Sequence, residues 1–215
     1  MIDKPTNYFE HHREELLNFI PEGSASILDI GCGSGGFLSN FDNKIYRVGI
    51  EPDIAAAEIA RQRADLIITG EFNEKSIVEL LEFSEVRKFD CIFFNDVLEH
   101  LYDPWSAIQL CKKILRPEGV IIASIPNILF YSNIWNILKK QDFVYENAGL
   151  MDITHVRFFT KKSMIRMFEK VGFDIKLVKG INSITSLKYH FFNFLLLNKI
   201  RDLKYLQFVI VAKTK

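Results

Sequence analysis

Short runs of apolar residues recur along the first part of the chain, separated by segments with helical spacing of apolar positions. The runs lie at residues 25–30, 46–51, 66–69, 89–95 and 120–125, and each is long enough for one β-strand. The fourth run, FDCIFFN, is typical of a strand that is buried on both faces of a parallel sheet. Because strands and helices alternate five times, the pattern predicts a doubly wound α/β sheet.

Helix boundaries follow from capping residues and periodicity. Asp53 precedes an alanine-rich segment and Asp103 precedes a proline, so helices are expected to begin after both residues. The spacing of Ile77, Leu80 and Leu81 predicts another helix. Further helices are expected at 5–20 and from 37–41 onward, and the helix after Asp103 is expected to bury Trp105, Ile108 and Leu115 before a turn at 117–119.

The last third of the chain is organised differently. Thr160 is expected to cap a helix that ends at Gly172, and strands are predicted at 173–178 and 206–213. This order is the one expected when an antiparallel last strand is inserted into the sheet, which gives seven strands in total. Residues 128–159 and 180–204 have no clean strand and are predicted to be cap insertions on a single domain that spans residues 1–215.

Charge and cysteine content exclude several classes of protein. Lys plus Arg and Asp plus Glu both number 27, so the formal net charge is zero and nothing favours a nucleic-acid partner. The three cysteines are widely spaced, which argues against disulfides or a zinc site and fits a reducing cytoplasm. The N-terminal segment lacks the apolar core of a signal peptide, and the apolar run at 191–197 is far shorter than the roughly 20 residues that span a bilayer. We therefore expect a cytoplasmic protein without stable membrane insertion.

The glycine-rich stretch ILDIGCGSGGF fits two cofactor templates. Gly31, Gly33 and Gly36 form the dinucleotide pattern G-x-G-x-x-G, whereas Gly31, Gly33 and Gly35 form the G-x-G-x-G pattern of methyltransferases. Glu51 ends the next strand about 20 residues later, where an acid binds ribose hydroxyls in both classes. These residues predict a cofactor that contains a nucleoside, and they leave its identity open.

Three further features favour S-adenosylmethionine over a nicotinamide cofactor. Asp29 lies two residues before Gly31, where it would repel a pyrophosphate and attract a sulfonium and an α-amino group. The chain has little room for the substrate-binding segment of a dehydrogenase. The third feature is the order of helix, strand, insertion and strand at the end of the chain, which is the order expected for an antiparallel last strand inserted into the sheet.

The chain resembles the class I S-adenosylmethionine-dependent methyltransferases. The resemblance is carried by ILDIGCGSGGF, VGIEPD, FDCIFFNDVLEHLYDP and LRPEGVIIASIPN, and it is strongest to the small-molecule branch that acts on ubiquinone and menaquinone precursors. The later stretch FVYENAGLMDITHVRFFTKKSMIRMFEKVGF is similar to methyltransferases found with glycan-assembly enzymes. The resemblance implies a doubly wound Rossmann-like fold and methylation, at oxygen, of a small-molecule or glycan-linked acceptor, with S-adenosylhomocysteine as the other product.

The resemblance also assigns cofactor contacts along the strand ends. Glu51 would bind the ribose hydroxyls and Pro52 would flank the adenine. Glu71 stands where the family usually has an Asp that reaches the adenine amino group, and Phe72 is predicted either to stack on the adenine or to belong to the core. The methionine side and the methyl group would be lined by Asp29, Gly31, Cys32, Gly33, Asn95, Asp96 and Val97. Cys32 is expected to pack in the loop rather than to act as a nucleophile.

Two histidines are candidates for a general base, which a neutral acceptor hydroxyl needs in order to attack a methyl group. His100 lies four residues after Asp96, and its alternative role is to cap or pack beneath the site. His155 lies between Asp152 and Arg157, and its alternative role is to anchor a loop. Arg157 is expected to contact the acceptor. Asp152 and His155 have no evident third ligand, so no metal site is predicted.

The aromatic residues of the first insertion, among them Tyr131, are expected either to line an acceptor pocket or to pack the cap. The apolar segment 187–200 is predicted to form a buried cap helix, with a homodimer face, a lid or a contact with a lipid-linked acceptor as alternatives. Two other functions stay open: an NAD-dependent oxidoreductase, and a non-catalytic relative that binds the cofactor and serves as a partner subunit.

Overall fold

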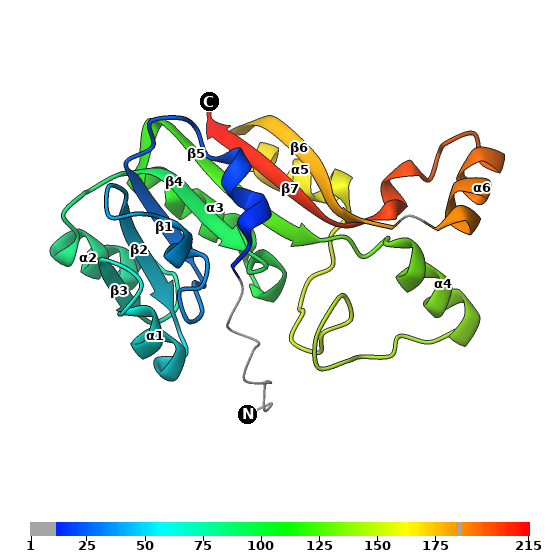
Figure 1. Cartoon of the computed structure of the whole chain (residues 1–215), viewed down its shortest axis with the longest axis horizontal. Helices are drawn as coiled ribbons and strands as arrows, with labels where there is room; N and C mark the ends of the chain where they lie inside the picture. The colour runs from blue at the N-terminus through cyan, green and yellow to red at the C-terminus, as the bar shows by residue number, and fades with distance from the viewer. Residues whose placement is uncertain (1–11, 185) are drawn as a thin grey trace.

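The computed structural model describes residues 12–184 and 186–215, which form a seven-stranded sheet with helices on both faces (Figure 1). The strand order is β3-β2-β1-β4-β5-β7-β6. β1 to β5 are parallel to their neighbours, whereas β7 runs antiparallel to both β5 and β6. The predicted doubly wound, Rossmann-like sheet with an inserted antiparallel last strand is confirmed. The strands are β1 (Ser26–Ile30), β2 (Tyr46–Glu51), β3 (Leu66–Thr69), β4 (Phe89–Asn95), β5 (Leu115–Pro126), β6 (Phe173–Ser183) and β7 (Tyr205–Thr214).

Two hydrophobic clusters cover the two faces of this sheet. One contains buried residues of α2, α3 and α5, and the other contains buried residues of η1, η2 and α1. Leu28 and Ile30 of β1 belong to the first cluster and Ile27 to the second, as expected for a strand buried on both faces. The helices are η1 (Glu14–Phe19), η2 (Leu38–Asn40), α1 (Ile54–Ala60), α2 (Glu74–Phe83), η3 (Leu98–His100), α3 (Pro104–Ile114), α4 (Tyr131–Lys140), α5 (Lys161–Lys170), α6 (Leu187–Leu195) and η4 (Arg201–Lys204).

The predicted helix caps are present. The Asp53 side chain accepts a hydrogen bond from the Ala56 N–H at 2.8 Å, and the Asp103 side chain accepts one from Ser106. Thr160 forms a reciprocal capping box with Ser163 at the start of α5. These caps fix where α1, α3 and α5 begin, and therefore also fix the loops that precede them at the carboxyl ends of the strands.

Local predictions were wrong where apolar spacing was the only guide. The helix expected at 5–20 is the six-residue 3₁₀ helix η1 in its described part, and residues 5–11 lie outside the described residues. The helix expected from 37–41 is the three-residue η2. Leu115 begins β5 instead of continuing α3, and the turn expected at 117–119 lies inside β5. The second insertion begins later than predicted because β6 continues to Ser183 and pairs there with Tyr205.

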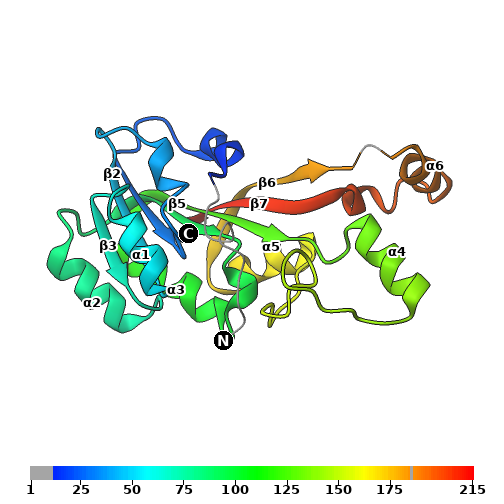
Figure 2. The ribbon, with the colours of Figure 1, turned by 60° about the horizontal axis from the view of Figure 1, so that its bottom comes forward.

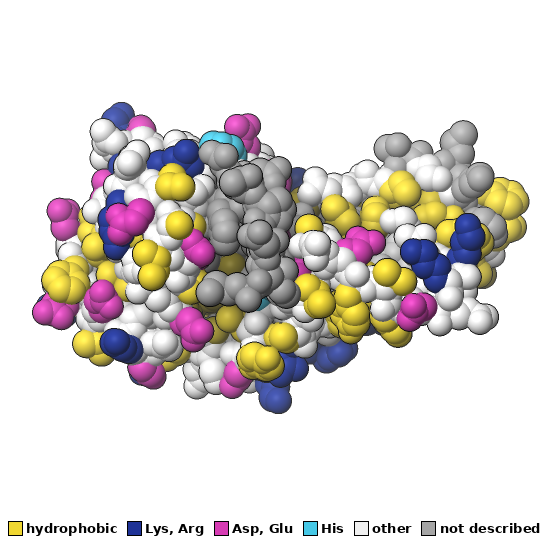
Figure 3. All heavy atoms as spheres, turned by 90° about the horizontal axis from the view of Figure 1, so that it is seen from below, with side chains coloured by type: hydrophobic (Ala, Val, Ile, Leu, Met, Phe, Trp, Pro, Cys, Tyr) yellow, Lys and Arg dark blue, Asp and Glu magenta, His cyan; other side chains and the backbone are white. Residues whose placement is uncertain are grey.

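Helices α4 and α6 project together beyond the ends of β5, β6 and β7 (Figures 1 and 2). The expected buried cap helix at 187–200 is wrong for most of its length, because the exposed fractions of Phe191, Phe194 and Leu197 are 59%, 72% and 79%. Tyr189 is buried and packs on Tyr131. Figure 3 shows hydrophobic side chains interspersed with Lys and Arg at this end of the molecule. A homodimer face stays a prediction.

Among the described residues, no helix has both the length and the apolar character needed to cross a bilayer.

The start of β1 is tied to β4 by Asp90, which gives a prediction for stability. Its carboxylate accepts hydrogen bonds from the Ala25 and Ser26 N–H groups and from the Ser26 hydroxyl, and it pairs with Arg116 at 2.9 Å. Burial alone would raise the pKa of Asp90, but the hydrogen bonds and Arg116 outweigh burial and lower it. A carboxyl whose pKa is lower in the folded state stabilises the fold above its unfolded pKa, and this contribution is lost as the pH falls through the folded value.

We expect Asp90→Asn to lower the free energy of unfolding by about 1–3 kcal/mol at neutral pH, because charge-assisted hydrogen bonds are weakened. The difference from the unmodified chain should shrink as the pH falls below about 3.9, the usual value for Asp. Urea unfolding across this pH range measures it. A destabilisation that is the same at acid and neutral pH would contradict the role of the charge.

Candidate functional site

The glycine loop after β1 has the backbone geometry of the G-x-G-x-G template. Gly31, Gly33 and Gly35 have φ angles of 71°, 55° and 78°, in the left-handed region that favours glycine. Gly36 is not among the described residues with positive φ. The loop is held to the next strand, since the Gly31 N–H donates to the Ile50 carbonyl at 2.8 Å. The left-handed conformation therefore explains why glycine stands at all three positions of the G-x-G-x-G template.

The loop approaches the end of β4 very closely at Gly31. A Cβ atom on Gly31 would lie 2.6 Å from Val97 Cγ2, so only glycine fits there without displacement of Val97. Cys32 points in the opposite direction: a Cβ on Gly49 of β2 would lie 2.5 Å from its Sγ. Burial raises the pKa of the Cys32 thiol well above its usual value. Cys32 therefore packs under the loop, as predicted, and its backbone is the part that can line a cofactor.

Glu51 joins the glycine loop to the start of α1. One carboxylate oxygen accepts a hydrogen bond from the Gly33 N–H at 2.8 Å, and the other accepts one from the Asp53 N–H at 2.9 Å. The residue is 4% exposed, and burial raises the pKa of its carboxyl although both backbone hydrogen bonds act against the shift. Each carboxylate oxygen can accept a second hydrogen bond. Glu51 therefore retains acceptor capacity at the end of β2, and its role toward the hydroxyls of a ribose stays a prediction.

Asp29 and Asn95 form a buried polar pair beside Gly31. The Asn95 amide donates to Asp29 Oδ1 at 3.0 Å, and Asn95 Oδ1 is buried and accepts no hydrogen bond from the described residues. Burial raises the pKa of the Asp29 carboxyl well above its usual value, and the nearby Glu51 adds to this shift. Both observations favour a cationic hydrogen-bond donor as the missing partner. The α-amino group of a bound S-adenosylmethionine has this chemistry, so the residues present fit this cofactor.

Asp96, predicted to line the methionine side, is held by protein groups. Its φ of 56° turns the chain sharply after β4, and its carboxylate forms an ion pair with Arg13. Its Oδ1 also accepts a hydrogen bond from the Gln207 amide at 2.7 Å. Nothing in the sequence indicated that Arg13 and Gln207 belong to the site, because both are distant from Asp96 along the chain.

The predicted adenine-side residues lie at the ends of β2 and β3. Pro52 and Glu71 are exposed there. Phe72 is half-buried, and its ring packs edge-on against Phe94 with centroids 6.1 Å apart. Phe72 therefore belongs to the edge of the core, and the roles of Pro52 and Glu71 toward adenine stay predictions.

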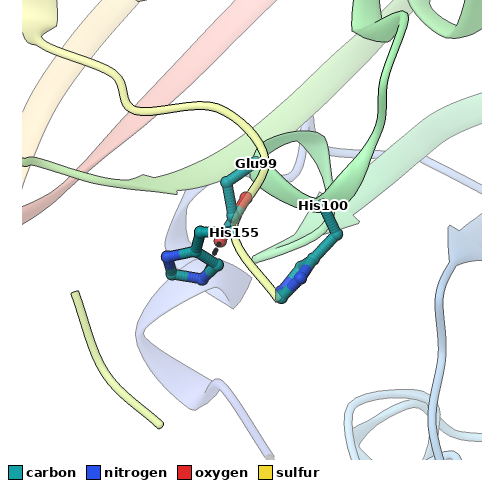
Figure 4. A group of neighbouring side chains, drawn as sticks. All are labelled: Glu99, His100 and His155. Atoms are coloured by element: carbon teal, nitrogen blue, oxygen red, sulfur yellow. Dashed lines mark ion pairs between the residues drawn. The ribbon is translucent and has the colours of Figure 1, made fainter. Parts of the chain in front are cut away.

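The two candidate bases meet in one cluster with an acid (Figure 4). Glu99 and His100 lie on η3, directly after the loop at the end of β4, and His155 comes from the loop before α5. The His100 and His155 rings have centroids 4.7 Å apart, and His155 Nε2 lies 3.9 Å from Glu99 Oε1. Glu99 was not predicted from the sequence, although its place beside His100 after a buried strand was a usable signal.

The tautomers of both histidines are determined by carbonyl groups of the loop. His100 Nδ1 lies 3.2 Å from the Thr154 carbonyl oxygen, and His155 Nδ1 lies 3.2 Å from that of Leu150. Because a carbonyl oxygen only accepts, each Nδ1 carries the hydrogen, and in the neutral ring Nε2 is the basic nitrogen. Thr154 in turn donates its hydroxyl to the buried Asp152 at 2.7 Å. Asp152 thus supports the cluster through Thr154.

Glu99 is the residue of the cluster whose burial is least offset by hydrogen bonds to its side chain. Its side chain is 2% exposed, and neither carboxylate oxygen has a hydrogen-bond partner among the described residues. Burial raises the pKa of Glu99 to about 8; Arg13 lowers it and Asp152 raises it. The Glu99 backbone carbonyl accepts the N–H groups of Val156 and Arg157, which attaches the loop to η3.

Arg157 and Tyr131, predicted to contact the acceptor, are engaged elsewhere. The Arg157 guanidinium donates to the Tyr102 carbonyl and stacks over Trp105, 4.8 Å from the ring centroid. It lines a cavity of about 870 Å³ beside α5 that includes no residue of the glycine loop. The Tyr131 ring packs edge-on against Tyr189 with centroids 5.4 Å apart. Both contacts support the anchoring and packing alternatives, and acceptor contacts stay predictions.

The class of this protein follows from its fold together with comparison to known families. The sequence profile of the methyltransferase domain family matches residues 6–178. The chain therefore belongs to the methyltransferase domain family, whose cofactor is S-adenosylmethionine, and the oxidoreductase alternative is not favoured.

Individual relatives agree with this assignment. The chain is 37% identical over 112 residues to a ubiquinone biosynthesis O-methyltransferase of Pasteurella multocida. The aligned region covers 47% of this chain and 46% of the relative. Protein MJ1123 of Methanocaldococcus jannaschii is 28% identical over 85% of this chain and 79% of its own length. A crystal structure of a SAM-dependent methyltransferase from Archaeoglobus fulgidus has the same fold, with a TM-score of 0.63 and 19% identity over 93% of this chain and 91% of the other. The matched part spans about half the length of the O-methyltransferase relative.

The close approach at Gly31 gives a testable prediction. Gly31→Ala places a Cβ against Val97 and adds the strain of a left-handed residue, about 1–2 kcal/mol. We expect at least about tenfold weaker S-adenosylmethionine binding, because a displaced loop loses the position of its N–H groups. Gly23→Ala is the matched control, since Gly23 has φ +80° but a Cβ there meets no atom within 4 Å. Equal cofactor affinity in both variants, measured by calorimetry, would refute the steric account.

Proposed function

We propose that this chain transfers the methyl group of S-adenosylmethionine to a hydroxyl oxygen of a small-molecule or glycan-linked acceptor. The observation that carries the proposal is the cluster of Glu99, His100 and His155 directly after the strand end that would line the methyl side of the cofactor. A cluster with two imidazoles of fixed tautomer is suited to accept or redirect a proton. Methylation of a hydroxyl requires the removal of a proton.

The chain's own residues would orient the cofactor in three places. Asp29 and Asn95 Oδ1 would accept the α-amino group, and Glu51 would accept the ribose hydroxyls. The glycine loop allows the cofactor backbone to approach closely. When bound, S-adenosylmethionine supplies a methyl group already activated by a cationic sulfur. The residues around it are then left with alignment, exclusion of water and proton removal.

Proton removal is the role we assign to the histidine cluster. Each ring has its Nδ1 hydrogen bonded to a carbonyl, so Nε2 is the nitrogen that can take the acceptor proton. His155 has a side chain that is 6% exposed, whereas His100 is half-buried and is better placed to meet an acceptor. Glu99 lies beside His155, and a positive charge that develops on His155 would favour the ionised form of the Glu99 carboxyl.

The choice of oxygen and of acceptor rests on two kinds of likeness. The curated relative in Pasteurella multocida is named for O-methylation in ubiquinone biosynthesis and matches 47% of this chain. The stretch D-I-T-H-V-R-F-F-T, which supplies Asp152 and His155, is similar to methyltransferases that accompany glycan assembly. The buried free thiols of Cys32, Cys91 and Cys111 fit a cytoplasmic enzyme.

The experiment is a methyl-transfer assay with hydroxyl acceptors of both kinds. Purified chain is incubated with S-adenosylmethionine labelled in its methyl group and with either catechols or nucleotide-linked sugars, and S-adenosylhomocysteine and the methylated acceptor are both measured. We expect equimolar formation of the two and an O-methyl signal in the acceptor. Methyl transfer to amine or thiol acceptors alone would contradict the proposal.

A further inference from the structure

The cluster of Glu99, His100 and His155 has the composition of a metal site. Two imidazoles and one carboxylate form the ligand set of several catalytic zinc sites, in which a fourth position stays open for water or substrate. One ligand atom from each of the three residues lies within 4.8 Å of the other two. We propose that these side chains bind a divalent transition-metal ion, with Zn²⁺ as the best match, and that its open position receives the acceptor hydroxyl.

The spacing is short enough for one ion to reach all three residues. Three atoms that are at most 4.8 Å apart have a common centre no more than about 2.8 Å from each atom, whereas Zn–N and Zn–O bonds are about 2.0–2.2 Å long. Each ligand atom would thus move inward by less than about 1 Å. Figure 4 shows Glu99 and His100 on the same turn of η3 and His155 of the facing loop beside Glu99.

The surroundings of the histidines are those of metal ligands. A ligating imidazole characteristically donates its other N–H to a carbonyl or carboxylate, which orients the ring. His155 does so to the Leu150 carbonyl and His100 to that of Thr154. Behind His100, Thr154 is itself held by the buried Asp152, to which it donates through both its hydroxyl and its N–H. The loop is therefore built to hold the two rings in position.

The Glu99 carboxylate lacks the hydrogen bonds that would offset the free-energy cost of burying an acid. Both oxygens of Glu99 are buried without a hydrogen-bond donor among the described residues. The facing imidazole nitrogen, His155 Nε2, lies 3.9 Å from Oε1, too far for a hydrogen bond. A cation between these atoms would neutralise the carboxylate and use the imidazole lone pair at the same time. Asp152, also buried, adds negative charge on this side, while Arg13 is paired with Asp96.

The ion would deepen the proposed function, on which its catalytic role rests. A hydroxyl bound to Zn²⁺ releases its proton at a lower pH than a free hydroxyl, and zinc undergoes no redox change. The new bond would join the acceptor oxygen to the methyl carbon, and the bond that breaks joins that carbon to sulfur. With the ion bound, the two imidazoles are its ligands, so the hydroxyl proton passes to water and the histidines assist proton removal through the metal instead of taking the proton themselves. Binding of the metal itself does not depend on this reaction.

The test begins with metal binding in the absence of cofactor and acceptor. Tag-free chain is treated with a chelator, dialysed and titrated with Zn²⁺ in a calorimeter, and Co²⁺ serves as a spectroscopic probe of ligand number. We expect one Zn²⁺ per chain and at least tenfold weaker binding in Glu99→Gln and His155→Ala. His190→Ala, which changes an exposed histidine on α6, should bind as the unmodified chain does. Thermal unfolding shows whether each variant is folded.

The outcomes distinguish a failure of the proposed metal site from a failure of the proposed methyl transfer. Failure of the unmodified chain to bind Zn²⁺, or equal affinity in Glu99→Gln, would overturn the metal site. Stoichiometric Zn²⁺ binding that weakens in both cluster variants supports it even if no hydroxyl acceptor is methylated, and the proposed O-methylation would then fail alone. Full methyl transfer to a hydroxyl by chelator-treated chain would support the proposed function and overturn the metal's role in it.

Discussion

Glu51→Ala should weaken S-adenosylmethionine binding by at least about 100-fold. Hydrogen bonds to a charged group contribute about 1.5–3 kcal/mol each, and Glu51 is proposed to accept two ribose hydroxyls. A factor of 100 corresponds to about 2.7 kcal/mol, which is within the contribution of two such bonds. The substitution also removes the acceptor for the Gly33 and Asp53 N–H groups, so the loop would be less well positioned. Calorimetric titration with S-adenosylmethionine measures the change.

Two further variants separate binding from folding. Glu51→Gln keeps the size of the side chain and loses its charge, so an intermediate loss is expected. Glu82→Ala changes an exposed acid on α2 and should leave the affinity unaltered. If Glu51→Ala melts at the temperature of the unmodified chain and still binds the cofactor with undiminished affinity, Glu51 does not bind the ribose.

The second large effect is expected at the histidine cluster. At least one of His100→Ala and His155→Ala should lose turnover by about 10²–10⁴-fold, the range that proton-transfer groups contribute. Cofactor affinity should stay the same, because Asp29, Asn95 and Glu51 are unaltered in both variants. Single-turnover rates with saturating cofactor give the loss directly, and His190→Ala controls for the removal of a histidine.

The pH profile distinguishes a base from a packing residue. Loss of a proton acceptor should flatten the dependence of turnover on pH, whereas a packing defect should lower the rate by a similar factor at every pH. Full activity in both histidine variants would show that the cluster takes no part in the reaction.

The sequence predicted the sheet well because its strands carry a strong local signal. The boundaries of Tyr46–Glu51, Leu66–Thr69 and Phe89–Asn95 match the predicted runs, since each is a nearly continuous apolar segment bounded by polar or turn residues. The start of α1 was equally predictable from Asp53, whose side chain accepts a hydrogen bond from the Ala56 N–H, a group without a partner inside the helix. The predictions failed at η1 and η2, where apolar spacing over a short segment does not distinguish an α-helix from a 3₁₀ turn.

The candidate site was predictable only where it is local. The glycine loop and Glu51 belong to adjacent elements, so their spacing along the chain already brings them together. The partnership of Glu99 with His155, and that of Asp96 with Arg13 and Gln207, depends on loops that return from distant parts of the chain. The exposure of α6 was also unpredictable, because an apolar segment carries no mark of whether it is covered.

The most direct measurement is calorimetric titration of the purified chain with S-adenosylmethionine, S-adenosylhomocysteine and NAD. The geometry of Gly31, Gly33 and Gly35, the buried Asp29–Asn95 pair and Glu51 predicts micromolar binding of the first two ligands at one site and no binding of NAD. Binding of NAD without binding of either S-adenosyl ligand would contradict the account at its centre.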